Sequence, residues 1–235
     1  MLYELRLYRV APGALDALHA RFRDHLPALF KAHGIECVGR WSVTSGPYTP
    51  GFVYMMAYRD LAEREARWAS FYADPEWARV RAATSTEIEL VERFDLAFLR
   101  TGTFWQPQAQ QAGQTLGGVH ELALQQVTIG QPAAVSQYLS ELYLPALREA
   151  GAQVMAACDM VSGFDMPQVV LLYAWPDAAA RQAGWEAMAR NPALRDAVLA
   201  QNRRLGRSLL GRADVYLLQP ASYSLPAASP GANLL

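Results

Sequence analysis

The sequence carries the same residue pattern twice, and this duplication constrains the fold more than any other feature. Glu4 and Leu5 recur 117 positions later as Glu121 and Leu122. The other matched landmarks are Ser45, Gly46, Asp60, Arg64, Trp68 and Pro75, which fall on Ser162, Gly163, Asp177, Arg181, Trp185 and Pro192. A fixed offset kept over a long span marks a repeated structural unit. The chain is therefore predicted to build one small fold twice.

The offset also indicates where the two copies begin and end. It becomes 118 between residues 25 and 32, where LPAL at 26–29 matches LPAL at 144–147, and a small loop difference would explain this slip. We predict a first domain at 1–105 and a second at 118–220. The polar segment 106–117 is typical of a linker, and the Pro-, Ala- and Ser-rich residues 221–235 form a tail.

Each copy is predicted to have the element order β-α-β-β-α-β. The first strand, YELRLYRV at 3–10, alternates apolar and polar residues. Apolar residues spaced three and four apart then indicate an amphipathic helix, which Gly34 ends as a C-cap. Pro27 and its counterpart Pro145 are expected to bend this helix. Two strands, a helical region at 60–85 and a last strand, FDLAFLRT, complete a ferredoxin-like unit.

Composition favours a folded protein and disfavours two classes of partner. Hydrophobic residues make up 52% of the chain and charged residues 18%, enough for a sizeable core. With 21 basic and 22 acidic residues and no basic run, we expect no nucleic-acid partner and no binding to an anionic membrane surface. No apolar run reaches the roughly 20 residues of a membrane span, and no signal peptide is recognisable. We predict a cytoplasmic protein whose Cys37 and Cys158 are reduced.

The sequence lacks the strong motifs of cofactor and metal chemistry. G-x-G-x-x-G, P-loop, H-E-x-x-H, G-x-S-x-G and paired C-x-x-C patterns are absent. His19 and His25 are six positions apart and do not share a helix face as a metal pair would. We therefore predict neither a metal site nor a cofactor. His33, just before Gly34, is expected to interact with the last carbonyls of its helix.

The candidate catalytic residues lie on the first strand. Leu5 and Leu7 are expected to face the helices, which leaves Glu4, Arg6 and Tyr8 on the other face. An arginine beside a carboxylate can orient an anionic or carbonyl ligand, if that face lines an enclosed space. The alternative is a structural ion pair on a partly wet sheet.

Further candidates come from the second copy and from the neighbouring strands. Glu121 would bring a second carboxylate into the same cavity, where the two groups could share a proton and one pKa would rise. Arg40, Trp41 and Tyr54 are candidate ligand-binding residues, because an arginine, an indole and a phenol can make an apolar pocket with polar anchors. For Trp41, simple core packing is the alternative.

The DPEW segment at 74–77 combines two carboxylates with an indole, and its counterpart explains it. Asp74 and Pro75 match an Asn-Pro pair that begins at Asn191. Asp and Asn are both good N-caps, and proline is favoured at the first helical position. The second copy has Ala-Leu where the first has Glu76-Trp77. A helix start tolerates that exchange and a catalytic pair of carboxylates does not, so DPEW is predicted to begin a helix.

The first copy resembles the NIPSNAP family. The resemblance rests on the first strand, the Pro-Gly helix start, the His-Gly helix end, GRW at 39–41 and AYRDLAEREARWASFYADPEW at 57–77. The second copy is a weaker match, with HELALQQV as its first strand and RNPALRD in place of the last motif. The resemblance implies a dimeric α+β barrel, in which two ferredoxin-like units enclose a cavity. Tandem copies would build that barrel within one α+β chain.

Three functions follow as hypotheses. The first is binding of a small hydrophobic or anionic organic ligand in the barrel cavity, with monooxygenase- or isomerase-like chemistry that needs no cofactor, as in other members of the superfamily. The second is a non-catalytic interaction or adaptor module, and the third is a haem-binding barrel. Whether the chain is an enzyme stays open, because fold does not determine reaction. Homo-oligomers are expected, since sheet faces of this kind prefer to be covered.

Overall fold

The structure is a computed structural model that describes residues 1–85, 88–105 and 118–224. The predicted linker at 106–117 and residues 225–235 of the predicted tail lie outside these ranges. None of the helices in the described ranges combines the length and the apolar character that crossing a membrane requires.

The chain divides into two compact units. Unit 1 is built on Met1–Arg100, and unit 2 on Thr101–Met160 and Asp165–Gln219. The short segment Val161–Phe164 and the described residues after Gln219 group with unit 1. The predicted domain bounds of 1–105 and 118–220 stay predictions.

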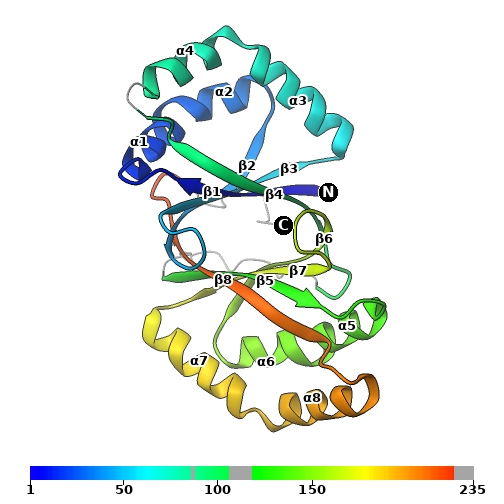
Figure 1. Cartoon of the computed structure of the whole chain (residues 1–235). Helices are drawn as coiled ribbons and strands as arrows, with labels where there is room; N and C mark the ends of the chain where they lie inside the picture. The colour runs from blue at the N-terminus through cyan, green and yellow to red at the C-terminus, as the bar shows by residue number, and fades with distance from the viewer. Residues whose placement is uncertain (86–87, 106–117, 225–235) are drawn as a thin grey trace. The chain divides into compact units, whose positions relative to one another are not determined.

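Unit 1 has the element order that the sequence pattern predicts. Its elements are β1 (Leu2–Val10), α1 (Leu15–Ala20), the π-helical segment η1 (Arg21–His25), α2 (Leu26–Ala32), β2 (Glu36–Ser45), β3 (Gly51–Tyr58), α3 (Leu61–Ala73), α4 (Pro75–Thr84) and β4 (Val91–Thr101). Figure 1 shows its helices together on one face of its sheet.

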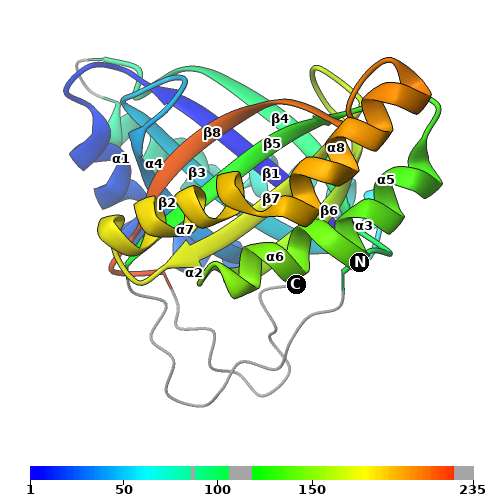
Figure 2. The same ribbon diagram turned by 90° about the horizontal axis from the view of Figure 1, so that it is seen from below.

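Unit 2 repeats this order. Its elements are β5 (Val119–Val127), α5 (Pro132–Tyr138), the π-helical segment η2 (Leu139–Tyr143), α6 (Leu144–Glu149), β6 (Gln153–Ser162), β7 (Gln168–Trp175), α7 (Ala178–Arg190), α8 (Pro192–Leu205) and β8 (Leu210–Pro220). Its helices likewise cover one face of its own sheet (Figure 2).

Each unit has an antiparallel sheet in which the first strand is central. In unit 1, β1 pairs with β3 and β4, and β2 pairs with β3. In unit 2, β5 pairs with β7 and β8, and β6 pairs with β7. The predicted α+β class is confirmed. The joining of the two units in one barrel stays a prediction.

The core of unit 1 shows which sheet face the helices cover. Alternate residues of β3, among them Phe52 and Tyr54, pack in one cluster with Phe22, Trp68 and other helix residues. Arg6 lies opposite Tyr54 in the β1–β3 register and therefore shares this helix-facing side. The Glu4–Arg6–Tyr8 face thus points toward the helices.

The predicted assignment of the two strand faces was therefore wrong. Leu5 and Leu7 pair with Met55 and Val53 on the opposite face. Alternation determines which residues share a face, but it does not determine which face the helices cover. Leu5 is 0% exposed and Glu4 is also 0% exposed, so burial on both faces removed the usual apolar signal.

The first helix of each unit contains a π-helical segment just before its proline. The Leu26 N–H donates to the carbonyl of Arg21, five residues back, and Pro27 follows. In unit 2 the Leu144 N–H donates to the carbonyl of Leu139 in the same way. Proline cannot donate to the helical ladder, so the wider turn occurs where the ladder is already interrupted. The bend predicted at the prolines is thus a π-helical turn.

The one-residue slip in the repeat lies in this helix. The predicted loop difference was wrong. α5 has 7 residues where α1 has 6, and α6 has 6 where α2 has 7. The second copy therefore reaches its π segment one residue later and recovers the offset at the helix end.

The chain after β8 contacts β2 of unit 1. The Ala221 N–H donates to the Arg40 carbonyl at 3.0 Å, and the Arg40 N–H donates to Ser224 Oγ at 3.1 Å. The Tyr223 hydroxyl lies 2.7 Å from Nδ1 of His19. Burial lowers the pKa of His19, so the imidazole is neutral at physiological pH.

Candidate functional site

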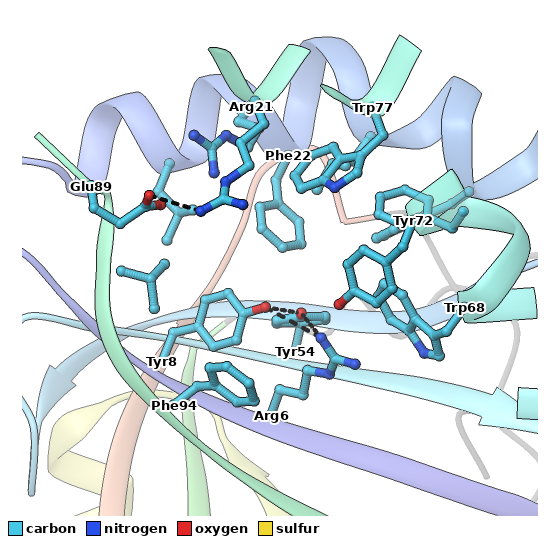
Figure 3. Close-up of a pocket in the computed structure, with 16 residues that line it drawn as sticks. Arg6, Tyr8, Arg21, Phe22, Tyr54, Trp68, Tyr72, Trp77, Glu89 and Phe94 are labelled. Carbon is cyan, nitrogen blue, oxygen red and sulfur yellow. Dashed lines mark hydrogen bonds and ion pairs between the residues drawn. The ribbon is translucent and has the colours of Figure 1, made fainter. Parts of the chain in front are cut away.

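Unit 1 contains a pocket of about 330 Å³ that its sheet and its helices line together (Figure 3). Strand residues at the pocket include Arg6, Tyr8 and Tyr54, and the helices contribute mostly aromatic and apolar side chains. The helix residues are Leu18, Arg21, Phe22, Leu26, Phe30, Trp68, Phe71, Tyr72, Trp77 and Arg81. A mostly apolar cavity with a few polar groups is the usual form of a small-molecule site.

Arg6 is held in place by Glu4, which lies outside the pocket lining, and by Trp68, which is part of it. Its Nε donates to Oε1 of Glu4 at 2.5 Å, and its guanidinium lies 4.1 Å from the ring centre of Trp68. Glu4 also accepts from Arg64, at 2.7 Å from Nε and 3.2 Å from Nη2. The carboxylate thus aligns two arginines and is 0% exposed. Glu4 positions Arg6 and does not itself line the cavity.

Two phenols complete the polar end of the pocket. The hydroxyls of Tyr8 and Tyr54 are 2.5 Å apart, and Arg6 Nη1 donates to Tyr54 at 3.2 Å and to Tyr8 at 3.4 Å. Figure 3 shows the three groups converging. Burial raises the pKa of Tyr54 well above its ordinary value, so it stays a neutral hydrogen-bond donor.

Arg6 keeps its positive charge in this setting. Burial disfavours the charged form, but the phenol oxygens of Tyr54 and Tyr8 and the carboxylate of Glu4 outweigh this effect and raise the pKa of Arg6. Among the described residues, its Nη2 nitrogen has no hydrogen-bond partner. The pocket therefore presents a fixed cation with donor capacity to spare, beside two hydroxyls.

The structure brings together only some of the predicted site residues. Arg6, Tyr8 and Tyr54 meet at the pocket, whereas Arg40 and Trp41 are absent from its lining. Arg40 is buried beside the segment that follows β8, and Trp41 pairs in register with Val53 on the opposite sheet face. A role for Arg40 and Trp41 in ligand binding has no support in this pocket.

Glu121 has a different environment in unit 2. Its Oε2 accepts from Nε of Arg181 at 2.6 Å, from the Trp175 indole at 3.1 Å and from the Trp185 indole at 3.2 Å. The expected sharing of a proton between Glu4 and Glu121 is wrong, because arginine N–H groups of its own unit already bind each carboxylate.

The second copy lacks the polar end of the pocket. Ala123 stands where unit 1 has Arg6, and the amide of Gln125, at the Tyr8 position, donates to the Gly211 carbonyl at 2.8 Å. A bulkier indole, Trp175, replaces Tyr58.

The helix position that faces Trp175 in unit 2 has changed as well. Gly184 stands where unit 1 has Arg67, and a Cβ added there would lie 2.2 Å from the Trp175 ring. The smaller residue thus makes room for the larger ring, and the copy has become a packed core at this point.

Several pocket residues were not among the sequence candidates. Trp68 and Tyr72 are four apart on α3, so they share a helix face, and their rings stack at 5.2 Å. One signal was available: Arg64 recurs as Arg181 at the offset that also relates Glu4 to Glu121. A carboxylate and an arginine retained together in both copies indicate a contact between the first strand and the helix that begins at Leu61.

The DPEW segment begins α4, as predicted, and also contributes to the pocket. Asp74 accepts from the Glu76 N–H at 2.8 Å as an N-cap, and Pro75 is the first helical residue. His33 binds Oδ2 of Asp74 at 2.8 Å with Nε2 and not the helix carbonyls, contrary to our expectation. Trp77 lines the pocket. Within the described ranges, no cluster of His, Cys, Asp and Glu is placed to hold a metal ion.

Residues 3–104 match the sequence profile of the NIPSNAP family. The chain carries a NIPSNAP domain. A NIPSNAP family protein of unknown function from Agrobacterium tumefaciens is 28% identical over 42% of this chain and 85% of its own length, with a TM-score of 0.37. No curated protein matches the chain.

Solved structures also resemble the chain over nearly its whole length. A proposed monooxygenase from Fusobacterium nucleatum is 10% identical over 93% of this chain and 91% of its own, with a TM-score of 0.58. An anthrone oxidase-like protein is 16% identical over 97% of this chain and 96% of its own, with a TM-score of 0.52. At such identities the likeness shows a shared α+β fold and no reaction.

Proposed function

We propose that the NIPSNAP domain binds a small, largely aromatic organic molecule through an acidic group that docks on Arg6. The observation that supports this is a buried arginine, oriented by Glu4 and Trp68, at one end of an aromatic cavity of about 330 Å³. The ligand would lie within unit 1, between its sheet and its helices.

The arrangement favours binding because the Arg6 side chain is already ordered before the ligand binds. Glu4 and Trp68 already hold the Arg6 guanidinium, so little side-chain freedom is lost on binding. A charge-assisted hydrogen bond to a carboxylate or an enolate is stronger than a neutral one, and more so away from water. The Tyr8 and Tyr54 hydroxyls can add a neutral hydrogen bond to the same group.

Replacing Arg6 by methionine is expected to abolish this anchor. We predict that wild-type protein binds 2-naphthoate, measured by isothermal titration calorimetry, and that Arg6→Met weakens binding at least about tenfold, since a hydrogen bond to a charged group contributes about 1.5–3 kcal/mol. The control is Arg195→Met, whose parent side chain is 66% exposed on α8. Failure of folded wild-type protein to bind any aromatic carboxylate would contradict the proposal.

A second candidate function is oxygenation without a cofactor. Arg6 and the two phenols could stabilise an enolate or phenolate, which can pass electrons to dioxygen, and an isomerase-like reaction could use the same enolate. The names of the solved relatives, a proposed monooxygenase and an anthrone oxidase-like protein, fit this chemistry. For an anthrone, the balanced reaction is anthrone plus dioxygen giving anthraquinone plus water. The anthrone loses a proton, the resulting anion combines with dioxygen and a proton to form a hydroperoxide, and the hydroperoxide then eliminates water.

Oxygen consumption tests this second candidate directly. An oxygen electrode should record uptake with an anthrone that exceeds the rate in buffer, and Arg6→Met should reduce the excess by at least about tenfold, as expected when one charge-stabilising donor is lost. Uptake equal to the buffer rate, from protein that does bind 2-naphthoate, would limit the pocket to binding.

Three wider expectations stay proposals beside these. The two units would be tandem ferredoxin-like domains at 1–105 and 118–220, the chain would self-associate, and it would reside in the cytoplasm. Light scattering of the purified protein would contradict the second of them if it gave the mass of one chain, 26.0 kDa.

A further inference from the structure

The pocket contains a second buried arginine that the proposed anchor does not use. Arg21, in the π-helical segment, is 5% exposed and lines the cavity together with Arg81 and Glu89. Figure 3 shows Arg21 and Arg6 on opposite sides of the pocket, with Phe22 and Trp77 placed along it. The cavity thus has two cationic ends.

Arg21 has only neutral hydrogen-bond partners among the described residues. Its Nε donates to Thr84 Oγ1 at 2.7 Å and its Nη2 donates to Ser85 Oγ at 2.6 Å. Among the described residues, Glu89 is the carboxylate whose charge acts on Arg21, and Arg81 binds it at 3.2 Å. Burial lowers the pKa of Arg21, and the charge of Arg81 adds to that effect while Glu89 opposes it. A buried charge whose counter-charge is already paired with another arginine is costly, so a bound anion would stabilise this end.

The described charges leave one positive charge in excess at each end. Arg6 and Arg64 share the single carboxylate of Glu4. Arg21 and Arg81 have the single carboxylate of Glu89 between them. The middle of the cavity is aromatic and supplies no further charge.

We propose that the ligand is a dianion with one acidic group at each end of a planar apolar body, and that Arg6 receives one acid and Arg21 the other. This inference rests on the proposed function and specifies its ligand class. A structural role for Arg21, as a clamp on the end of α4, needs only the two neutral hydrogen bonds. The two roles of Arg21 can therefore be distinguished. Ligand affinity depends on the charge of Arg21 if the residue binds an anion, and does not depend on it if the residue is only a clamp.

Matched mono- and diacids test the inference. Calorimetry would compare 2-naphthoate with 2,6-naphthalenedicarboxylate, and benzoate with terephthalate, so that two spacings are covered. At one spacing or both, we expect the diacid to bind wild-type protein at least about tenfold more tightly than its monoacid, as for one added charge-assisted hydrogen bond. Arg21→Met should remove this gain, so that a diacid and its monoacid bind the variant within about threefold of each other.

A second variant guards against misfolding. Arg21→Gln keeps two donors for Thr84 and Ser85 without the charge, and should melt near the wild-type temperature while losing the diacid gain. If monoacids bind and neither diacid improves on its partner, or if the gain survives in Arg21→Gln, the dianion inference is overturned while the Arg6 anchor stands. If neither monoacids nor diacids bind, the proposed function itself fails.

Discussion

Glu4→Gln is expected to lower the free energy of unfolding of unit 1 by about 3–5 kcal/mol, the usual result of removing one partner of a buried ion pair. Both carboxylate oxygens of Glu4 accept from arginine: Oε1 from Arg6 and Arg64, and Oε2 from Arg64. A glutamine has one carbonyl oxygen, so its amide NH₂ would face an arginine donor. The substitution therefore removes a charge. It also places two hydrogen-bond donors, the amide NH₂ and an arginine N–H, opposite each other.

Urea unfolding followed by tryptophan fluorescence would measure this loss. The control is Glu65→Gln on α3, whose parent side chain is exposed, and it should stay within about 0.5 kcal/mol of wild type. We also expect Glu4→Gln to weaken 2-naphthoate binding by at least about tenfold, because Arg6 loses the group that orients it. An affinity equal to wild type, with stability lost, would show that the Glu4–Arg6 pair is structural only.

The duplication predicted much of the fold, and particular elements show why. β1 starts at Leu2 and β5 at Val119, and β3 starts at Gly51 and β7 at Gln168, so both pairs keep the 117-residue offset. Alternation and helical spacing are local properties, and a second copy of the pattern confirms each local inference independently. The helix start at Asp74 followed from cap chemistry alone.

The position of the pocket did not follow from local pattern. Sequence alternation grouped Arg6 with Glu4 and Tyr8, but the face they occupy depends on where the helices pack, which is a tertiary property. Arg21 and Trp77 come from two helices far apart in sequence, and no single periodicity relates them. A charged residue such as Arg21 in an otherwise apolar helix stripe, beside Phe22, was the available sign of a polar group inside a pocket.

The two copies differ in a way that separates stability from binding. Unit 1 keeps Arg6 and an open cavity, while unit 2 has Ala123 and a packed indole pair around Glu121. Both units contain a buried carboxylate paired with an arginine of the following helix, Glu4 with Arg64 and Glu121 with Arg181. We infer that this pair contributes to the stability of each unit. The arginine of β1 occurs in the first copy only, which supports placing the ligand there.

Glu121→Ala should lower the free energy of unfolding of unit 2 by about 3–5 kcal/mol, whereas Glu121→Gln should cost about half as much or less. Alanine leaves Arg181 and two indole N–H groups without their acceptor. Glutamine can place its carbonyl oxygen where Oε2 accepts all three, and its amide NH₂ toward the Tyr173 hydroxyl, so only the charge is lost. The same isosteric change is thus severe at Glu4 and mild here.

Hydrogen exchange measured by mass spectrometry would assign the effect of Glu121→Ala to its unit. Amides of β5 and β7 should exchange faster than in wild type while those of β1 and β3 change little, and Glu149→Gln, at an exposed site on α6, serves as the control. The affinity for 2-naphthoate should stay within about threefold of wild type, because the anchor lies in unit 1. A loss of naphthoate binding in Glu121→Gln, with β1 and β3 still protected, would contradict a ligand site confined to the NIPSNAP domain.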